Sequence, residues 1–595
     1  MSDWVLLRCR AGSQTRGVTS EQTIKDRGVE ALKTAAGWPG ADRATLVTLA
    51  TILAATGADA EGLSFFEALA ADQPDQALPL TLAGYFGVRA GRDIRAALAR
   101  LDEAASRDLG PAQYYRGLAL AGMPPESGHA AQAVADLEFV LAVRDQFPVA
   151  MMRAVQHGLA AARAALDKKD LAGQAAADSG LSAAPPGVRL EFSGFWMNAA
   201  DGFRFGSPVM AEPAPGIQVA QGYDFGDFAF VRTDDGVVAI DAGTAEHRVR
   251  AALRDAGLEA SAIGYVILTH SHFDHAGGIG ALLRPGTRVI AQASFPAELQ
   301  RQHANIMPFR YYTGDGAGFG AAGNGAEPPP IAVHQLVSEP ATVSIGGTDL
   351  VLYPVAGGET ADALMVYLPA SGVLFTGDVM MPYLGAPFFA EGSPEGLLDT
   401  LRFVAGLRPK MLVHGHITLT ENFTAEAVPG LLLALAELRD RAVAGLGRGM
   451  TLAALLDANY LPEVLREHPK AVVPYTVIRD HFVQRLHRQH TGYWQADGQG
   501  MEPVGAADRA AAFDLLAEGR PDRFTAAART LLRHSDHALA LEIITAGLAR
   551  HPDATELAGL RQQVLYRLME RHQVQDPFRF LIYAEMAGVE IAATR

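Results

Sequence analysis

The chain has 595 residues, too many for one hydrophobic core, so we expect about two to four domains. Hydrophobic residues make up 49% and charged residues 19%, a balance typical of a folded globular protein. The formal net charge of −16 argues against nucleic acid and anionic membrane surfaces as partners. Cys9 is the single cysteine of the sequence, which excludes an intrachain disulfide.

The N-terminus does not resemble a targeting signal. Residues 1–17 contain Arg8, Arg10 and Arg16 and no long apolar core, unlike a secretory signal. No run of the sequence approaches the ~20 apolar residues of a membrane span. We therefore expect a cytoplasmic protein with no membrane partner.

Residues 1–170 form the first predicted region, a succession of helices rich in alanine and leucine. Segments 77–107 and 111–137 each suggest a helical hairpin, with a spacing near the ~34 residues of a tetratricopeptide unit. The region is therefore loosely tetratricopeptide-like. It could bind a peptide or a partner chain, or pack on its own catalytic domain, and we favour the second interpretation.

A linker over residues 171–188 follows, and the pattern changes at residue 189. Up to residue 430, strand-like runs alternate with glycine and aspartate turns. Segments 228–231 and 237–240 predict two paired strands, 245–256 predicts a helix, and the Gly/Ala-rich stretch 314–330 predicts a loop. Residues 431–595 return to helical patterns, including a hairpin at 538–564.

The most informative motif is the string His270-Ser271-His272-Phe273-Asp274-His275, which directly follows the apolar run 265–268. Residues two apart in an extended chain point to the same side, so His270 and His272 can bind one metal ion together. Asp274 and His275 come where the chain must turn and can face a neighbouring ion. Imidazole and carboxylate ligands suit zinc, and also iron or manganese.

Three more acidic or imidazole side chains follow predicted strands. Glu359 comes after the run 350–355, Asp378 after 373–375 and His416 after 411–413. A rigid sheet can position loop residues at the ends of its strands. In series with the histidine-rich string, these residues predict a site for two metal ions.

The pattern His270-x-His272-x-Asp274-His275, followed by Asp378 and His416, resembles the metallo-β-lactamase fold superfamily. This resemblance implies an α/β fold: an αββα sandwich of metallohydrolases, here flanked by an N-terminal helical-repeat-like region and a C-terminal all-helical domain. The predicted catalytic domain covers residues 189–430.

Glu359 departs from most of that superfamily, where a histidine follows the equivalent glycine. A glutamate there, 378 − 359 = 19 residues before the next acid, resembles the alkylsulfatase branch. The strings around Tyr223, Asn305 and Arg310-Tyr311-Tyr312 are also similar to that branch, and residues 477–503 resemble the start of its helical dimerisation domain. The resemblance covers roughly residues 190–595 and implies a homodimer through residues 431–595.

The resemblance also implies the roles of the site residues. One zinc ion would be held by His270, His272 and Glu359, and the other by Asp274, His275 and His416, with Asp378 bridging the two. A water bound by the ions would be activated for attack, and Asp274 would help to orient it. The substrate head group would contact a further set of side chains: Tyr223, Asn305, Arg310, Tyr311 and Tyr312.

The segment Met380–Phe389 is a second departure, because it is apolar where alkylsulfatases have an arginine-containing stretch. Either sulfate is held differently or the substrate is not a sulfate ester. We expect a small anionic or ester substrate, with hydrolysis of sulfate esters that carry an apolar tail as the leading hypothesis. Hydrolysis of carboxylic esters, lactones or related amides is the alternative, and a helical-repeat scaffold with a vestigial metal site is a third.

Overall fold

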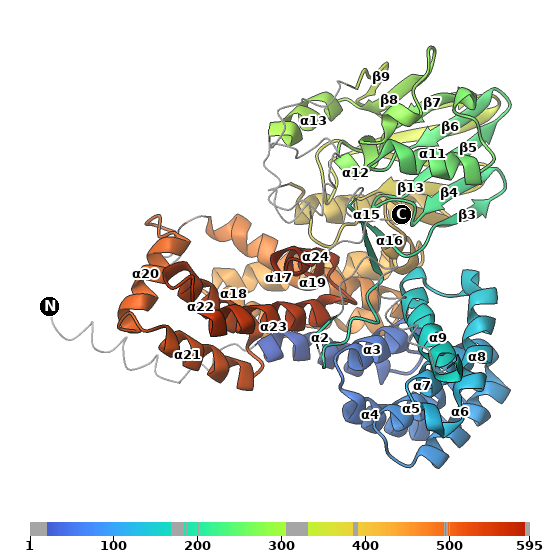
Figure 1. The fold of residues 1–595 in the computed structure, drawn as a ribbon. Coiled ribbons are helices and arrows are strands. Elements are labelled where there is room, and N and C mark those ends of the chain that lie inside the picture. The colour runs from blue at the N-terminus through green and yellow to red at the C-terminus, as the bar shows by residue number, and fades with distance from the viewer. Residues whose placement is uncertain are drawn as a thin grey trace. The chain divides into compact units, whose positions relative to one another are not determined.

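The computed structural model describes residues 21–167, 184–185, 187–198, 202–304, 331–384, 391–492, 494, 498 and 500–589. The chain divides into two compact units (Figure 1). One unit contains Met1–Ala31 and Gly492–Leu568, and the other contains Leu32–Thr491 and Met569–Arg595. Among the helices described, none is both long and apolar enough to span a membrane.

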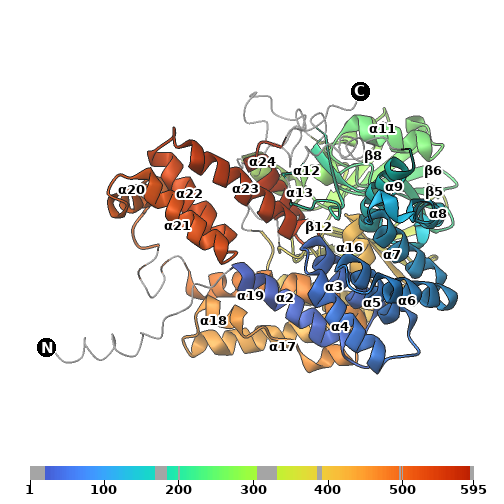
Figure 2. The same cartoon turned by 60° about the horizontal axis from the view of Figure 1, so that its bottom comes forward.

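From residue 43 onward, the N-terminal helices of the larger unit pack side by side in the order of the sequence (Figure 2). The helix before them, residues 21–36, spans the boundary between the two units. Their starts are fixed locally: the Asp42 side chain accepts a hydrogen bond from Ala44 N, and Asp93 accepts one from Ala96 N. The hairpins predicted at 77–107 and 111–137 are confirmed as α5–α6 and α7–α8. The helices are α2 (Glu21–Ala36), α3 (Arg43–Ala55), α4 (Asp59–Asp72), α5 (Ala77–Arg89), α6 (Ile94–Arg107), α7 (Leu109–Ala121), α8 (Ala130–Ala142) and α9 (Met152–Asp167).

Two stacked sheets follow (Figure 1). A seven-stranded sheet has the order β3-β4-β5-β6-β7-β8-β9, and a five-stranded sheet has the order β10-β11-β12-β13-β14. A separate two-stranded ribbon pairs β1 with β2. The strands are β1 (Phe195–Asn198), β2 (Gly202–Phe205), β3 (Val209–Ala214), β4 (Ile217–Gln221), β5 (Phe228–Thr233), β6 (Gly236–Ile240), β7 (Ile263–Ile267), β8 (Arg288–Gln292), β9 (Gln335–Val337), β10 (Ala341–Ile345), β11 (Thr348–Val355), β12 (Ala363–Leu368), β13 (Val373–Gly377) and β14 (Met411–His414).

The alternation of side chains along the strands builds two apolar layers. On β6, Val238 faces the core between the two sheets, whereas Ala239 faces the core beneath helix α11 (Glu246–Asp255). On β11, Tyr353 faces outward, and its ring lies 4.9 Å from that of Phe403 on α15 (Pro394–Leu407). Helices therefore cover both outer faces, and the predicted αββα sandwich is confirmed. Its predicted strand pair is the antiparallel pair β5–β6.

The remaining helices surround this sandwich or belong to the smaller unit. Helices α20 and α21 both pack on α22 in that unit, and α17 packs on α19 in the larger one. The hairpin predicted at 538–564 corresponds to α22 and α23. The bounds are α12 (Phe273–Ala276), α13 (Phe295–Ala304), α16 (Ile417–Asn422), α17 (Val428–Gly447), α18 (Leu452–Asp457), α19 (Val472–Thr491), α20 (Ala506–Leu516), α21 (Pro521–Arg533), α22 (His537–Arg550), α23 (Thr555–His572) and α24 (Pro577–Met586).

Candidate metal centre

The seven predicted ligands lie at strand ends of both sheets. Strand β7 of the larger sheet leads into the histidine-rich string, and strands β11, β13 and β14 of the smaller sheet lead to Glu359, Asp378 and His416. All seven side chains are buried. The fold thus brings together residues that are up to 416 − 270 = 146 positions apart in the sequence.

His270, His272 and Glu359 form what we call the first ligand group. One atom from each lies within 4.8 Å of the others. Glu359 stands between the two rings: its Oε2 is 3.4 Å from His270 Nε2, and its Oε1 is 3.5 Å from His272 Nδ1. The alternation that places His270 and His272 on the same side of the chain therefore produces the expected pair.

Asp274, His275, Asp378 and His416 form the second ligand group, with ligand atoms again within 4.8 Å of one another. His416 Nε2 lies 2.8 Å from Asp378 Oδ2 and 3.4 Å from Asp274 Oδ2. His275 Nε2 lies 3.4 Å from both of those oxygens. Four potential metal-ligand atoms thus face one small volume.

The nitrogen and oxygen atoms of both groups are suited to binding metal ions. His270 Nε2, His275 Nε2, Asp274 Oδ1 and Asp378 Oδ1 are buried and have no hydrogen-bond partner. Buried polar atoms without a partner are costly, and cations bound in the two groups would offset that cost. The geometry and the ligand types together support a site for two metal ions.

A buried aspartate on the larger sheet supports imidazoles in both groups. Asp241 Oδ2 lies 2.9 Å from His275 Nδ1, so His275 presents Nε2 to the centre. The same oxygen accepts a hydrogen bond from Thr269 Oγ1 at 2.7 Å, and Thr269 Oγ1 lies 3.0 Å from His270 Nδ1. Because the single hydroxyl proton of Thr269 goes to Asp241, the hydroxyl oxygen can accept the Nδ1 proton of His270.

The other two imidazoles are oriented separately. His416 Nδ1 donates to the backbone oxygen of Phe225 at 2.8 Å. His272 Nε2 lies 2.9 Å from Glu391 Oε2, and the other oxygen of Glu391 accepts a hydrogen bond from Arg301 at 2.7 Å. Such outer contacts fix the tautomer and the ring orientation of metal-binding histidines. All four histidines therefore direct a ring nitrogen inward.

The charges of the carboxylates depend on these imidazoles. Burial alone would raise the pKa of Asp378, but His416 and His275 hold it well below its usual range. Burial raises the pKa of Glu359 well above its usual range, and the opposing effect of His272 is smaller. Because a carboxyl group binds metal in its ionised form, we expect cation binding to the first ligand group to depend on pH.

Glycine is required where the backbone passes close to the ligands. A Cβ on Gly415 would lie 2.3 Å from Asp378 Oδ1 and 2.4 Å from His275 Cε1. A Cβ on Gly226 would lie 2.2 Å from the backbone oxygen of Asp274. These close approaches show how tightly the backbone packs against the second ligand group.

The structure does not bring Tyr223 to the metal centre. Its hydroxyl donates to Asp255 Oδ2 at 2.7 Å, and its ring is part of the apolar core beneath α11. The expectation that Tyr223 holds the substrate head group finds no support in this placement. Four other predicted substrate contacts lie outside the described residues: Asn305, Arg310, Tyr311 and Tyr312.

Sequence reasoning missed two residues that support the ligands, Asp241 and Glu391, and a neighbouring cation, Arg485. Asp241 follows a buried strand just as the ligands do, and that position was the available signal. Glu391 and Arg485 have no local signal, because the partners of each lie far away in the sequence. Arg485 on α19 donates to the backbone oxygens of Leu384 at 3.0 Å and Gly392 at 3.3 Å. It thus supplies a cation beside the apolar segment that follows Asp378.

The fold and the two ligand groups define a metallo-β-lactamase-type metal centre. In agreement, residues 222–416 match the family model of the metallo-beta-lactamase superfamily. These residues form a domain of that superfamily, as the histidine-rich motif indicated.

Within the superfamily, the chain is similar to alkylsulfatases. It is 22% identical over 332 residues to the linear primary-alkylsulfatase of Pseudomonas sp. (strain ATCC 19151), covering 51% of this chain and 63% of that protein. The stereoselective inverting sec-alkylsulfatase Pisa1 from Pseudomonas sp. shares the fold with a TM-score of 0.51 and 15% identity, over 65% of this chain and 66% of the other. The predicted resemblance to this branch is confirmed.

A third relative is not an alkylsulfatase by name. The chain is 27% identical over 169 residues to the hydroxyacylglutathione hydrolase of Rhodobacter capsulatus, which covers 28% of this chain and 54% of that protein. The chain thus spans between about half and two thirds of the length of the curated relatives it matches.

Proposed function

We propose that this protein is a dinuclear zinc hydrolase that cleaves sulfate esters carrying an apolar tail. The observation that carries the proposal is the pair of ligand groups, with Glu359 in the first and Asp378 in the second. Similarity to the linear primary-alkylsulfatase and to sec-alkylsulfatase Pisa1 supports the substrate class. Zinc is the proposed metal because the ligands are imidazole and carboxylate.

The metal ions and the carboxylates of the second ligand group would have different roles in the reaction. When bound, two zinc ions would supply a water of lowered pKa and Lewis-acid stabilisation of the leaving group. Within the second ligand group, Asp274 keeps one unpartnered oxygen, Oδ1, which can accept a proton from the attacking water. Asp378, whose pKa is already held low by His416 and His275, would offset part of the charge of the cations.

A second candidate function is hydrolysis of a carboxylic ester or a related thioester. The similarity to a hydroxyacylglutathione hydrolase favours it, as does the apolar character of the segment after Asp378. Within that segment, Met380 and Leu384 are buried and pack inside the domain, while Met381 borders a cavity. Both candidates use the same metal centre and differ in the head group of the substrate.

One experiment separates the candidates. We would quantify the metals in the purified protein and measure sulfate release from dodecyl sulfate beside hydrolysis of an acyl ester of the same chain length. Glu359→Ala should abolish either activity, whereas Glu259→Ala, at an exposed position, should leave it unchanged. Two zinc ions with sulfate release support the proposal. Two metals with ester hydrolysis alone support the second candidate, and a metal content near zero contradicts both.

The homodimer expected through residues 431–595 is a further proposal. Leu515 and Leu516, at the end of α20, are 81% and 76% exposed. Two adjacent exposed leucines offer an apolar surface that a second copy would cover. Light scattering would measure the molar mass in solution, and a monomer at micromolar concentration would contradict this proposal.

A further inference from the structure

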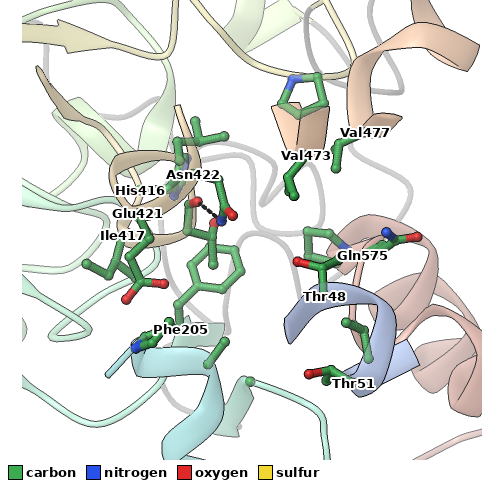
Figure 3. Close-up of a pocket in the computed structure, with 18 of the residues that line it drawn as sticks. Thr48, Thr51, Phe205, His416, Ile417, Glu421, Asn422, Val473, Val477 and Gln575 are labelled. Carbon is green, nitrogen blue, oxygen red and sulfur yellow. Dashed lines mark hydrogen bonds between the residues drawn. The ribbon is translucent and has the colours of Figure 1, made fainter. Parts of the chain in front are cut away.

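An apolar cavity of about 260 Å³ lies beside the metal centre, within the larger unit (Figure 3). Its walls include helix α3, the start of helix α9, the segment around strands β1 and β2, residues 381–383, helix α16, helix α19 and the beginning of α24. Thr48 and Thr51 on α3 face Glu421 and Asn422 on α16 across the space, and Val473 and Val477 on α19 close another side.

The lining of this apolar cavity is mostly hydrocarbon, with Val47, Phe205, Phe225, Val477 and Phe578 among its members. Interiors of folded proteins contain few voids larger than a water molecule, and cavities near this size are typical of small-molecule sites. Water would gain few hydrogen bonds from such walls. The lining therefore suits an apolar ligand.

The cavity borders the metal centre through one of the seven ligands, His416. His416 of the second ligand group is a wall residue, and so is Phe225, whose backbone oxygen holds His416 Nδ1 at 2.8 Å. Met381 also lines the cavity, and its backbone N–H donates to the backbone oxygen of Asp378 at 2.9 Å. A ligand in the cavity would therefore lie directly against residues that hold the second ligand group.

The N-terminal helices supply a wall but no metal ligand. Helix α3 lies outside residues 222–416, which carry the superfamily domain. The N-terminal region is also tied to helix α16, since Val149 N donates to Glu421 Oε1 at 2.6 Å. The far wall of the cavity is thus an addition to the sandwich, placed where it limits how far a ligand can extend from His416.

We propose that this cavity binds the apolar part of the substrate and that helix α3 determines which chain lengths fit. The occupant is an unbranched alkyl or acyl chain of the molecule whose head group reaches the metal centre. The identity of the substrate's head group rests on the proposed function. The binding of an alkyl or acyl chain in the cavity does not.

The first test measures binding without catalysis. Isothermal titration calorimetry would follow 1-octanol binding to the metal-depleted protein, to Thr48→Trp and to Ala68→Trp. Thr48 faces the cavity, whereas Ala68 is exposed on α4 and does not line it. Thr48→Trp should weaken binding about tenfold, as expected when about two methylene groups lose their place. The control should bind like the parent protein.

The second test uses the metal-loaded protein and a series of substrates from ethyl to dodecyl chains. Thr48→Trp should lower kcat/KM for the longest chains about tenfold through KM, while the value for ethyl substrates stays within about twofold. Val477→Trp, on the side that α19 closes, should have the same effect. It shows whether the result depends on a local distortion of α3. Circular dichroism would verify that both variants fold.

The outcomes are distinguishable. Equal octanol binding by all folded variants, or no binding by the parent protein, overturns the cavity assignment. Octanol binding that Thr48→Trp weakens, together with no hydrolysis of any substrate, supports the cavity assignment and refutes the proposed function. If Thr48→Trp lowered activity equally for every chain length, helix α3 would not determine which chain lengths fit.

Discussion

The two ligand groups share a set of ligand types but differ in what holds them. The second ligand group contains two carboxylates, and its imidazoles are oriented by Asp241 and by the Phe225 backbone. The first contains one carboxylate, and His272 depends on Glu391, which lies 119 residues away and is paired with the half-exposed Arg301.

This difference concerns both charge and rigidity. Two carboxylates attract a divalent cation more strongly than one, and support from a sheet moves less than support from a connecting segment. We therefore expect the second ligand group to bind its metal more tightly and the first to lose its metal more readily. The predictions below test this order.

The largest effect should follow the loss of a ligand from each group in turn. Glu359→Ala should leave about one metal per chain, because the second ligand group is intact, whereas His416→Ala should leave clearly less than one, because the intact first ligand group holds its metal more weakly during dialysis. Activity should fall by at least about 10³-fold in each case. Elemental analysis after dialysis measures the metals. If His416→Ala retained one metal and Glu359→Ala retained none, the order of affinity would be the reverse of that proposed.

A smaller effect is expected from the residues that orient the histidines. Asp241→Asn keeps a residue type that tolerates the positive φ of 60° at this position, but its amide would oppose the hydrogens of Thr269 Oγ1 and His275 Nδ1. It should lower metal affinity about 10–100-fold in both groups. Glu391→Gln should do so in the first ligand group alone. Competition with a zinc-binding dye gives the two affinities.

A control for these two variants is Asp255→Asn. That carboxylate, exposed at the end of α11, accepts the Tyr223 hydroxyl and belongs to neither ligand group. Metal affinity should not change in this variant. If Glu391→Gln lowered the metal affinity of both ligand groups equally, the two groups would not be independent.

The smallest effect concerns Glu421, a carboxyl group that faces the apolar cavity and belongs to neither ligand group. Burial raises its pKa from 4.5 to about 7. The folded state therefore favours the protonated form, and the unfolded state ionises first as pH rises. The free energy of unfolding should fall between pH 4.5 and 7 by roughly 2 kcal/mol, after allowance for water in the cavity, and then level off.

Glu421→Gln should remove that part of the pH dependence while its amide oxygen still accepts the bond from Val149 N. Urea unfolding at pH 5 and pH 8 measures the effect. The carboxylates of the second ligand group should behave in the opposite way, since imidazoles hold the pKa of Asp378 low. A variant with the same pH dependence as the parent protein would show that Glu421 is solvated in both states.

The sequence predicted those features that depend on local patterns. The spacing of His270 and His272 and the acids that follow buried strands are visible in short windows. The sandwich was implied by the resemblance that these motif residues carry. By contrast, Glu391 meets His272 from 119 residues away, and the path of the intervening chain is not encoded in any short motif.

Two other features also escaped sequence reasoning. Tyr223 follows a family-like string, yet its hydroxyl is bound by Asp255 on α11, a pairing that depends on how the helix packs on the sheet. Side chains of α3, α16 and α19 help to form the apolar cavity. Within the sequence of each helix, these positions are indistinguishable from core positions. Tertiary packing alone distinguishes a cavity wall from a core position.

The walls of the cavity also have a consequence for biosynthesis. Thr51 on helix α3 and Phe578 of α24 border the same space, although 578 − 51 = 527 residues separate them. At ~5–20 residues per second, a ribosome needs roughly half a minute to two minutes to make that interval. Throughout that time the apolar face of α3 lacks its final neighbours. The newly made chain therefore offers a binding surface to chaperones before it offers one to substrate.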